Sequence, residues 1–121
     1  MSEQHPISRV EREALQTLGL ARRAGRLVIG TEAVLKAGRA RRLRAAVVAR
    51  DASDNARRRV AGRLGDGVPI VECGTRTWLG SAVGRGRVAV VGVTDGALGS
   101  RIISVLEAGE EGSRELEAGR R

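Results

Sequence analysis

The sequence is poor in the residues on which several classes of protein depend. Trp78 is its only aromatic residue, because Phe and Tyr are absent. RRM-like domains and single-strand-binding platforms stack bases on several aromatic rings, so the composition argues against both. Cys73 is the only cysteine and His5 the only histidine. This pair excludes an intrachain disulfide, a Cys/His zinc site and a His-based catalytic pair in the body of the chain.

Long apolar runs are also lacking. No stretch approaches the about 18 consecutive apolar residues that a transmembrane helix needs. The opening segment, MSEQHPISRVEREA, is polar and lacks the apolar region of a secretory signal. These features predict a soluble cytoplasmic protein with no membrane partner.

Two segments that suggest a cofactor or a metal site fail in their details. The Gly-Arg-Gly-Arg segment at 84–87 precedes an apolar run instead of joining a strand to a helix, and it lacks the third glycine of a dinucleotide-binding loop. Residues 51–55 resemble the start of a calcium loop, but Ala56 and Gly62 replace its required Gly and Glu. We therefore expect no cofactor, no metal and no enzymatic activity, and we interpret 51–55 as a helix N-cap cluster.

Positive charge is the most informative feature that is present. The chain has 22 Lys+Arg against 14 Asp+Glu, a net charge of +8, and a pI near 11.5. Residues 1–64 carry 15 basic and 6 acidic side chains and thus +9, whereas residues 65–106 carry +1 and residues 107–121 carry −2. A domain this basic predicts a polyanionic partner, with nucleic acid ahead of an anionic membrane surface.

Helix-like and strand-like segments alternate along the chain, which is long enough for one domain. Short apolar runs predict strands at 27–29, 45–49, 68–71 and 88–93. Helices can be capped by Ser8, by Asp51 or Ser53, and by Asp95, and two more helices should begin at Thr31 and Thr75. We expect an α/β domain over 8–106, an N-terminal tail over 1–7, and a disordered or frayed Gly- and Glu-rich tail over 107–121.

The apolar runs also predict which side chains form the core. Continuous apolar strands are typical of a sheet that is covered on both faces. Trp78 should cover one sheet edge. The expected core residues are Val47, Val48, Ile70, Val71, Val90, Val91 and Val93.

Each of two arginine clusters has either a purely structural role or a role in binding RNA. Arg57, Arg58, Arg59 and Arg63 lie opposite the apolar face of the third helix, where they form either a solvated face or an RNA contact. Arg39, Arg41, Arg42 and Arg44 follow the second helix, whose C-terminal dipole favours cations. Four cations within six residues exceed that role, so contact with a phosphate backbone is an equal alternative.

The segment over 30–36 combines several features suited to RNA. Gly30 allows close approach of a ligand, and a helix N-terminus presents free N–H groups and partial positive charge. Glu32 can accept hydrogen bonds from a guanine edge, and Lys36 lies one turn further on the same face. Alternatively, Glu32 and Lys36 form only an i,i+4 pair that stabilises the helix by about 0.3–0.5 kcal/mol.

Three longer stretches resemble the L7Ae/L30e family of RNA-binding proteins, especially its small bacterial L7Ae-like members. They are LGLARRAGRLVIGTEAVLKA at 18–37, VVARDASDNARRRV at 47–60 and VPIVECGTRTWLGSAVGRGRVAVVGVTD at 68–95. They occur in the family's order and spacing, and the resemblance spans about 15–106. It implies a three-layer α/β/α sandwich around a mixed β-sheet. It also implies a non-enzymatic protein that binds structured RNA, either a kink-turn-like or a ribosomal RNA.

The resemblance also implies a site. In the family, a Gly-x-Asn-Glu-x-x-Lys turn reads sheared G·A pairs of kink-turn RNA, and a loop before the last core strand packs on a flipped-out nucleotide. Here Gly30 and Lys36 match, while Glu32 and Ala33 replace the Asn and Glu. Residues 85–88 match the loop. The candidate RNA-binding residues are Arg26, Gly30, Thr31, Glu32, Lys36, Arg39, Arg76, Arg85, Gly86 and Arg87.

Each candidate has an expected role. The segment 30–36 should make the central contact, with the loop at 85–87 beside it and Arg26 near the turn. Arg39 and Arg76 are expected to contact phosphates. Arginines at 85 and 87 favour backbone contact over base reading.

Two further functions remain open. One is a protein-interaction or adaptor module on the same fold, which predicts an exposed apolar patch. The other is a stand-alone, inactive relative of the substrate-binding domain that some RNA methyltransferases carry. The proposed partners are structured RNA and, through it, the ribosome.

Overall fold

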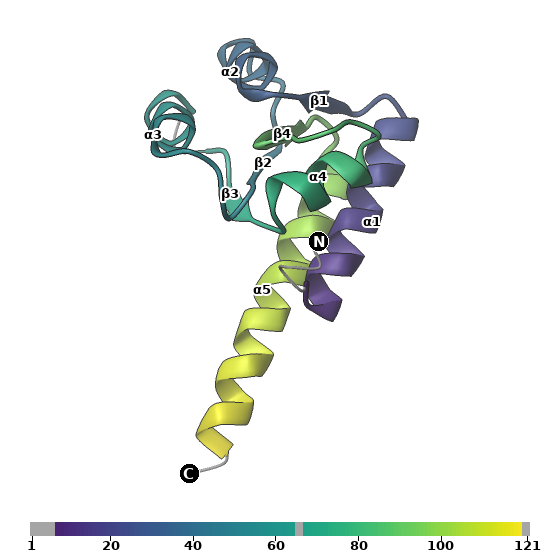
Figure 1. Cartoon of the computed structure of the whole chain (residues 1–121), viewed down its shortest axis with the longest axis vertical. Coiled ribbons are helices and arrows are strands. Elements are labelled where there is room, and N and C mark those ends of the chain that lie inside the picture. The colour runs from purple at the N-terminus through teal and green to yellow at the C-terminus, as the bar shows by residue number, and fades with distance from the viewer. Residues whose placement is uncertain (1–6, 65–66, 120–121) are drawn as a thin grey trace.

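A four-stranded mixed sheet lies between two layers of helices in this computed structural model, which describes residues 7–64 and 67–119 (Figure 1). The strands are β1 (Leu27–Ile29), β2 (Ala45–Val48), β3 (Ile70–Glu72) and β4 (Val90–Val93). The helices are α1 (Arg9–Arg23), α2 (Thr31–Arg39), α3 (Asp54–Arg63), α4 (Arg76–Ala82) and α5 (Gly96–Gly119). Helices α2 and α3 cover one face of the sheet and α1, α4 and α5 cover the other. The α/β/α sandwich is thereby confirmed.

The spatial order of the strands is β1-β4-β2-β3. Strand β4 runs antiparallel to both of its neighbours, whereas β2 and β3 run parallel. Gly92 lies in the middle of β4, where a Cβ atom would approach a methyl carbon of Leu43 to 2.5 Å. Only glycine therefore allows Leu43, which leads into β2, to pack this closely on the central strand.

Local side-chain caps set the starts of α1, α3, α4 and α5, whereas α2 begins after Gly30 without a side-chain cap. The Ser8 hydroxyl accepts from the Glu11 N–H, and the Glu11 carboxylate accepts from the Ser8 N–H. Thr75 caps α4, and the Asp95 carboxylate accepts a hydrogen bond from the third residue of α5. Ser53, and not Asp51, caps α3.

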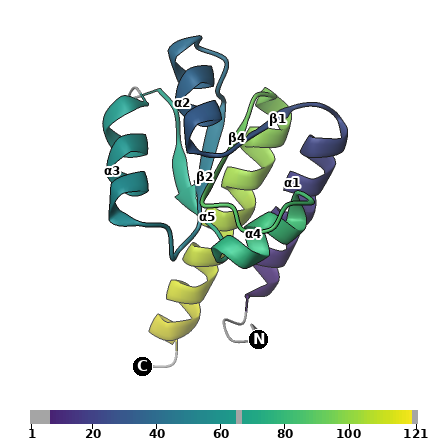
Figure 2. The same ribbon diagram turned by 45° about the horizontal axis from the view of Figure 1, so that its top comes forward.

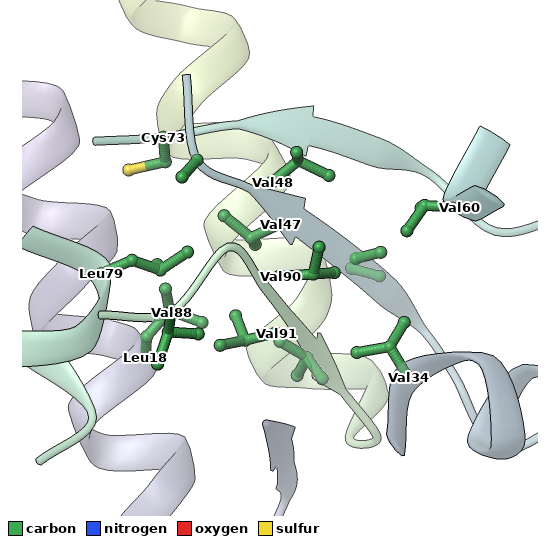
Figure 3. Packing of buried hydrophobic residues seen from close by; sticks show 14 of the residues in the cluster. Leu18, Val34, Val47, Val48, Val60, Cys73, Leu79, Val88, Val90 and Val91 are labelled. Carbon is green, nitrogen blue, oxygen red and sulfur yellow. The ribbon is translucent and has the colours of Figure 1, made fainter. Parts of the chain in front are cut away.

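Valines of the two central strands form the middle of the core. Figure 3 shows Val47, Val90 and Val91 between Leu18 and Leu79 on one side and Val34 and Val60 on the other. The structure confirms five of the predicted core residues as buried, which are Val47, Val48, Val90, Val91 and Val93. Val71 is half-buried against this core, and so is Trp78, which lies on α4 beside α1.

The prediction that Ile70 is a core residue is wrong. Its side chain is 40% exposed. Strand β3 is at the edge of the sheet and has only β2 as a neighbour, so an apolar residue at its start is not enclosed. The order of the strands, which the apolar pattern does not contain, decides this exposure.

The ends of the chain depart from the expected tails. Helix α5 continues to Gly119, so residues 107–119, predicted as a disordered or frayed tail, are helical and project beyond the sheet (Figure 1). Ala, Leu, Glu and Arg are strong helix formers, and extending an existing helix costs less than starting one. Ile7, assigned to the N-terminal tail, packs against the core. Residues 1–6, 65–66 and 120–121 lie outside the described residues.

The described helices contain no segment that is both long and apolar enough to cross a bilayer.

Arg41 has an unusual backbone conformation that generates a stability prediction. It follows α2 with φ of 58°, and its N–H donates to the Gly38 carbonyl while the next N–H donates to Ala37. A left-handed conformation disfavours residues with a Cβ atom. We expect Arg41→Gly to raise the free energy of unfolding by about 0.5–1 kcal/mol, as measured by urea denaturation. Arg42→Gly is the control and should lower it; an Arg41→Gly protein less stable than the parent would contradict this interpretation.

Cys73 is fully buried, and this gives a second prediction. Burial raises the pKa of its thiol to about 12, and the nearby Glu11 carboxylate adds to the rise. The thiol therefore stays protonated and enclosed at pH 8. We expect no reaction of the folded protein with iodoacetamide at that pH and complete reaction in denaturant, measured by mass spectrometry. Equal labelling of folded and unfolded protein would show that the site is open.

Candidate nucleic-acid interface

Strand directions bring four connecting segments to one end of the sheet. Strands β1, β2 and β3 end there and β4 begins there. Hydrogen bonds of 2.8 Å join the Gly30 N–H to the Val90 carbonyl and the Ala49 N–H to the Ala89 carbonyl. We call this region the carboxyl end; it comprises the starts of α2, α3 and α4 and the loop over 83–89. Open α/β folds commonly bind ligands at such an end.

The start of α2 presents free backbone donors at the carboxyl end. Gly30 is the N-cap residue, with φ of 99° and ψ of 153°, a conformation that residues with a Cβ atom avoid. No side chain of the described residues caps this helix. Its first N–H groups and its positive dipole end are therefore available to an anion or a base edge. Thr31 is half-buried here, and Lys36 is exposed one turn further along.

The loop before β4 is held firmly beside this helix start. Val83 and Val88 are buried at its two ends. The Arg85 N–H donates to the Gly80 carbonyl at 2.8 Å, and a Cβ atom at Gly80 would lie only 2.1 Å from the Gly86 oxygen. The segment between the two valines is exposed and consists of Gly84, Arg85, Gly86 and Arg87. Because Gly30 is bonded to the first residue of β4, the structure brings the predicted turn and the predicted loop to the same end of the sheet.

Glu32 does not form the helix-stabilising pair that its spacing from Lys36 allows. Its exposed carboxylate pairs instead with Arg59 of α3, at 2.5 Å from Nη2. This contact ties the start of α2 to α3. Lys36 has no ion-pair partner among the described residues, so its ammonium group is available to a ligand.

Arg57 has a structural role that the sequence analysis did not anticipate. Its guanidinium donates to the carbonyls of Ala49, Arg50 and Ala52 and pairs with Glu72. The side chain thus fixes the connection between β2 and α3. The solvated-face interpretation of this arginine cluster applies only to Arg58 and Arg63, which are exposed.

Arg76 and Asp51 pair at the start of α4. The Asp51 carboxylate accepts a 2.8 Å hydrogen bond from the Arg76 N–H and lies 3.5 Å from the Arg76 Nε. Burial acts to raise the pKa of Asp51, but the hydrogen bond and the charge of Arg76 outweigh it and hold that pKa below the ordinary value. Arg76, predicted as a phosphate contact, therefore already has an anionic partner.

Arg26 and Arg39 lie away from the carboxyl end. Arg26 precedes β1, and its carbonyl accepts a 2.9 Å bond from Thr94 at the far end of β4. The chain runs about 13 Å along β1 from Arg26 to Gly30, so the prediction that Arg26 lies near the turn is wrong. Arg39 is the last residue of α2, about 12 Å along the helix axis from Thr31.

The carboxyl end therefore offers cations and backbone donors. Its exposed cations include Arg85 and Arg87 of the loop, near the first N–H groups of α2, and Lys36 in the last turn of α2 extends the cationic surface along this helix. Among the described residues, no three His, Cys, Asp or Glu side chains are grouped so as to hold a metal ion. This arrangement can bind phosphates and the acceptor atoms of base edges.

Known proteins resemble this chain in sequence and in fold. RNA-binding protein YlxQ of Bacillus subtilis (strain 168) is 34% identical over 91 residues, which cover 74% of this chain and 91% of that protein. A solved structure of a protein with unknown function from Bacillus halodurans C has a TM-score of 0.74 and 28% identity, covering 78% of this chain and 96% of that one.

A second solved structure, the Giardia lamblia 15.5kD RNA binding protein, has a TM-score of 0.66 and covers 88% of this chain and 92% of that one. At 18% identity it shows a shared fold. The family described as ribosomal protein L7Ae/L30e/S12e/Gadd45 matches residues 12–101, three quarters of the sequence. The chain therefore belongs to the family described as ribosomal protein L7Ae/L30e/S12e/Gadd45.

Proposed function

We propose that this protein binds structured RNA in the cytoplasm, without catalysis, through the carboxyl end of its sheet. The observation that carries the proposal is the 2.8 Å bond between Gly30 and Val90, which sets an uncapped helix start beside an arginine-bearing loop. Membership of the family and the likeness to a protein named for RNA binding support the same ligand class.

Each part of the carboxyl end has a role in this proposal. The N–H groups at the start of α2 and the Lys36 ammonium contact phosphates or base edges. Arg85 and Arg87 contact phosphates of the RNA strand beside the bound segment. The loop that carries these arginines is fixed at both ends, so it holds them in position. Gly86 lets the strand approach the backbone of this loop closely.

Glu32 and Ala33 shape the specificity. A carboxylate accepts hydrogen bonds but donates none, and an alanine side chain does neither. Losing one bidentate base contact costs about 1–3 kcal/mol of discrimination between bases. We propose that binding relies more on the bent backbone of a kink-turn-like or ribosomal RNA than on base reading. Association with the ribosome would follow from such an RNA.

An adaptor function finds less support. It calls for a continuous exposed apolar patch. Among the described residues, the exposed large apolar side chains are Leu20 and Ile70. Leu20 lies on α1, which packs beside the edge strand β1, whereas Ile70 lies on β3 at the opposite edge, so the two do not form one patch.

A double substitution tests the proposed site. We expect Lys36→Ala with Arg85→Ala to weaken binding of a fluorescent kink-turn RNA by about 10- to 100-fold, because two charge-assisted contacts are lost. Fluorescence anisotropy measures the affinity, and circular dichroism melting checks that the fold is intact.

The matched control for this experiment is Arg63→Ala with Arg101→Ala. It removes the same charge from exposed positions at the end of α3 and on α5, away from the carboxyl end, and should change the affinity by less than about 3-fold. If the site variant binds as tightly as the parent, or the control loses as much, the site is wrong.

Salt dependence tests the ligand class. About six neutralised phosphates give a slope of log affinity against log salt of about −4 to −5. We expect this slope for the parent protein between about 50 and 300 mM KCl, a range in which the release of counterions changes the affinity measurably. A flat response would be inconsistent with docking on an RNA backbone.

A further inference from the structure

We propose that the opposite end of the sheet is a second, separate binding surface for the phosphate backbone of double-helical RNA. We call it the arginine end. Its members are Arg26, Arg39, Arg41, Arg42 and Arg44. The proposal rests on the proposed function only for its ligand class, because none of these residues belongs to the carboxyl end.

Hydrogen bonds to β4 place the arginine end. The Arg44 N–H donates to the Val93 carbonyl at 2.8 Å, and the Thr94 N–H donates to the Arg26 carbonyl at 2.9 Å. Arg26 and Arg44 thus flank the last residues of β4 from two sides, about 10 Å apart across two strand spacings. The C-terminal end of α2 adds the other three arginines. In Figure 2 the α2–β2 and β4–α5 connections lie at the top of the molecule, whereas the start of α3 lies at the bottom.

The charges at the arginine end are not neutralised within the described part of the chain. All five side chains are exposed, and none has an ion-pair partner among those residues. In contrast, Arg57, Arg59 and Arg76 near the carboxyl end each pair with a carboxylate. The dipole of α2 stabilises cations in its last turn, but it does not account for Arg26 or Arg44, which lie beyond that helix.

Arg41 adds an independent observation. It is the one residue other than glycine with a positive φ among the described residues. At this position, directly after a helix, glycine is the residue that fits without strain. The chain instead holds an exposed guanidinium there, in the middle of the cluster. Strain of this kind is common at positions that contact a ligand.

The chemistry of the cluster favours phosphates over other polyanionic surfaces. The segment over 39–44 exposes only Ala40 besides its arginines, since Leu43 is buried against the core. Membrane-surface binding inserts apolar side chains, and single-strand binding stacks bases on aromatic ones. This surface has neither, so it fits the outer phosphates of a duplex, which need only fixed cations.

Two surfaces at opposite ends of one sheet have a functional consequence. While the carboxyl end holds a bent segment of RNA, the arginine end remains free to contact a second helix. One protein would then hold two helices of a folded RNA together.

The experiment compares three variants of the full chain with the parent. The arginine-end variant carries Arg39→Gln, Arg41→Gly, Arg42→Gln and Arg44→Gln. The charge control carries four substitutions of exposed arginines away from the arginine end, which are Arg9→Gln, Arg12→Gln, Arg50→Gln and Arg58→Gln. The third protein is the carboxyl-end variant, Lys36→Ala with Arg85→Ala. The probe is a blunt 20-base-pair RNA duplex, and melting curves confirm the fold.

We expect the arginine-end variant to lose more than about 10-fold in duplex affinity and its salt slope to shrink by about 2–3, because about three phosphate contacts are lost. The charge control and the carboxyl-end variant should stay within about 3-fold of the parent. The proposal is overturned if the arginine-end variant binds the duplex like the parent, or if the charge control loses as much.

Two further measurements distinguish this proposal from membrane binding and from the function proposed for the carboxyl end. If the arginine-end substitutions abolish binding to phosphatidylglycerol vesicles and leave duplex binding unchanged, the surface binds membranes and the proposal is wrong. Kink-turn RNA binding that depends on Lys36 and Arg85, together with an unaffected duplex affinity in the arginine-end variant, refutes only the second surface. A parent protein that binds neither RNA refutes the proposed function itself.

Discussion

The antiparallel position of β4 between β1 and β2 determines where every other functional feature lies. Because β4 runs against both neighbours, the end of β1 and the start of β4 are held together by the bond from Gly30 to Val90. A helix start and a loop more than fifty residues apart in the sequence therefore meet. The same pairing places Arg26 and Arg44 at the other end of the strand. Valine packing on both faces of β4 keeps this arrangement rigid.

The net charge of the chain overstates how much cationic surface it offers. Arg57, Arg59 and Arg76 are partly enclosed and pair with carboxylates, and Arg57 also satisfies three carbonyls in the connection from β2 to α3. These side chains stabilise the structure around the carboxyl end more than they add to its positive electrostatic potential. Among the described residues, exposed arginines without a carboxylate partner lie at both ends of the sheet and also on α1, α3 and α5.

Features that depend on neighbours in the sequence were predictable, and features that depend on strand order were not. The caps at Ser8 and Thr75 follow from local hydrogen-bonding capacity, and the apolar runs locate the central strands. Ile70 is exposed because β3 is an edge strand, which the apolar pattern does not show. Arg26 and Gly30 lie at opposite ends of β1, a separation that the predicted strand over 27–29 already implied. The pairing of Glu32 with Arg59 spans 27 residues and has no local signal. The role of each candidate residue in RNA binding stays a prediction.

The central claim is that one protein engages RNA through the carboxyl end of its sheet. Nuclear magnetic resonance is the most direct measurement, because amide shifts report each residue while a kink-turn RNA is added to the full chain. The account predicts that the large shifts fall on residues 30–36 and 85–88. Large shifts confined to α1 and α5, with those two segments unchanged, would contradict it.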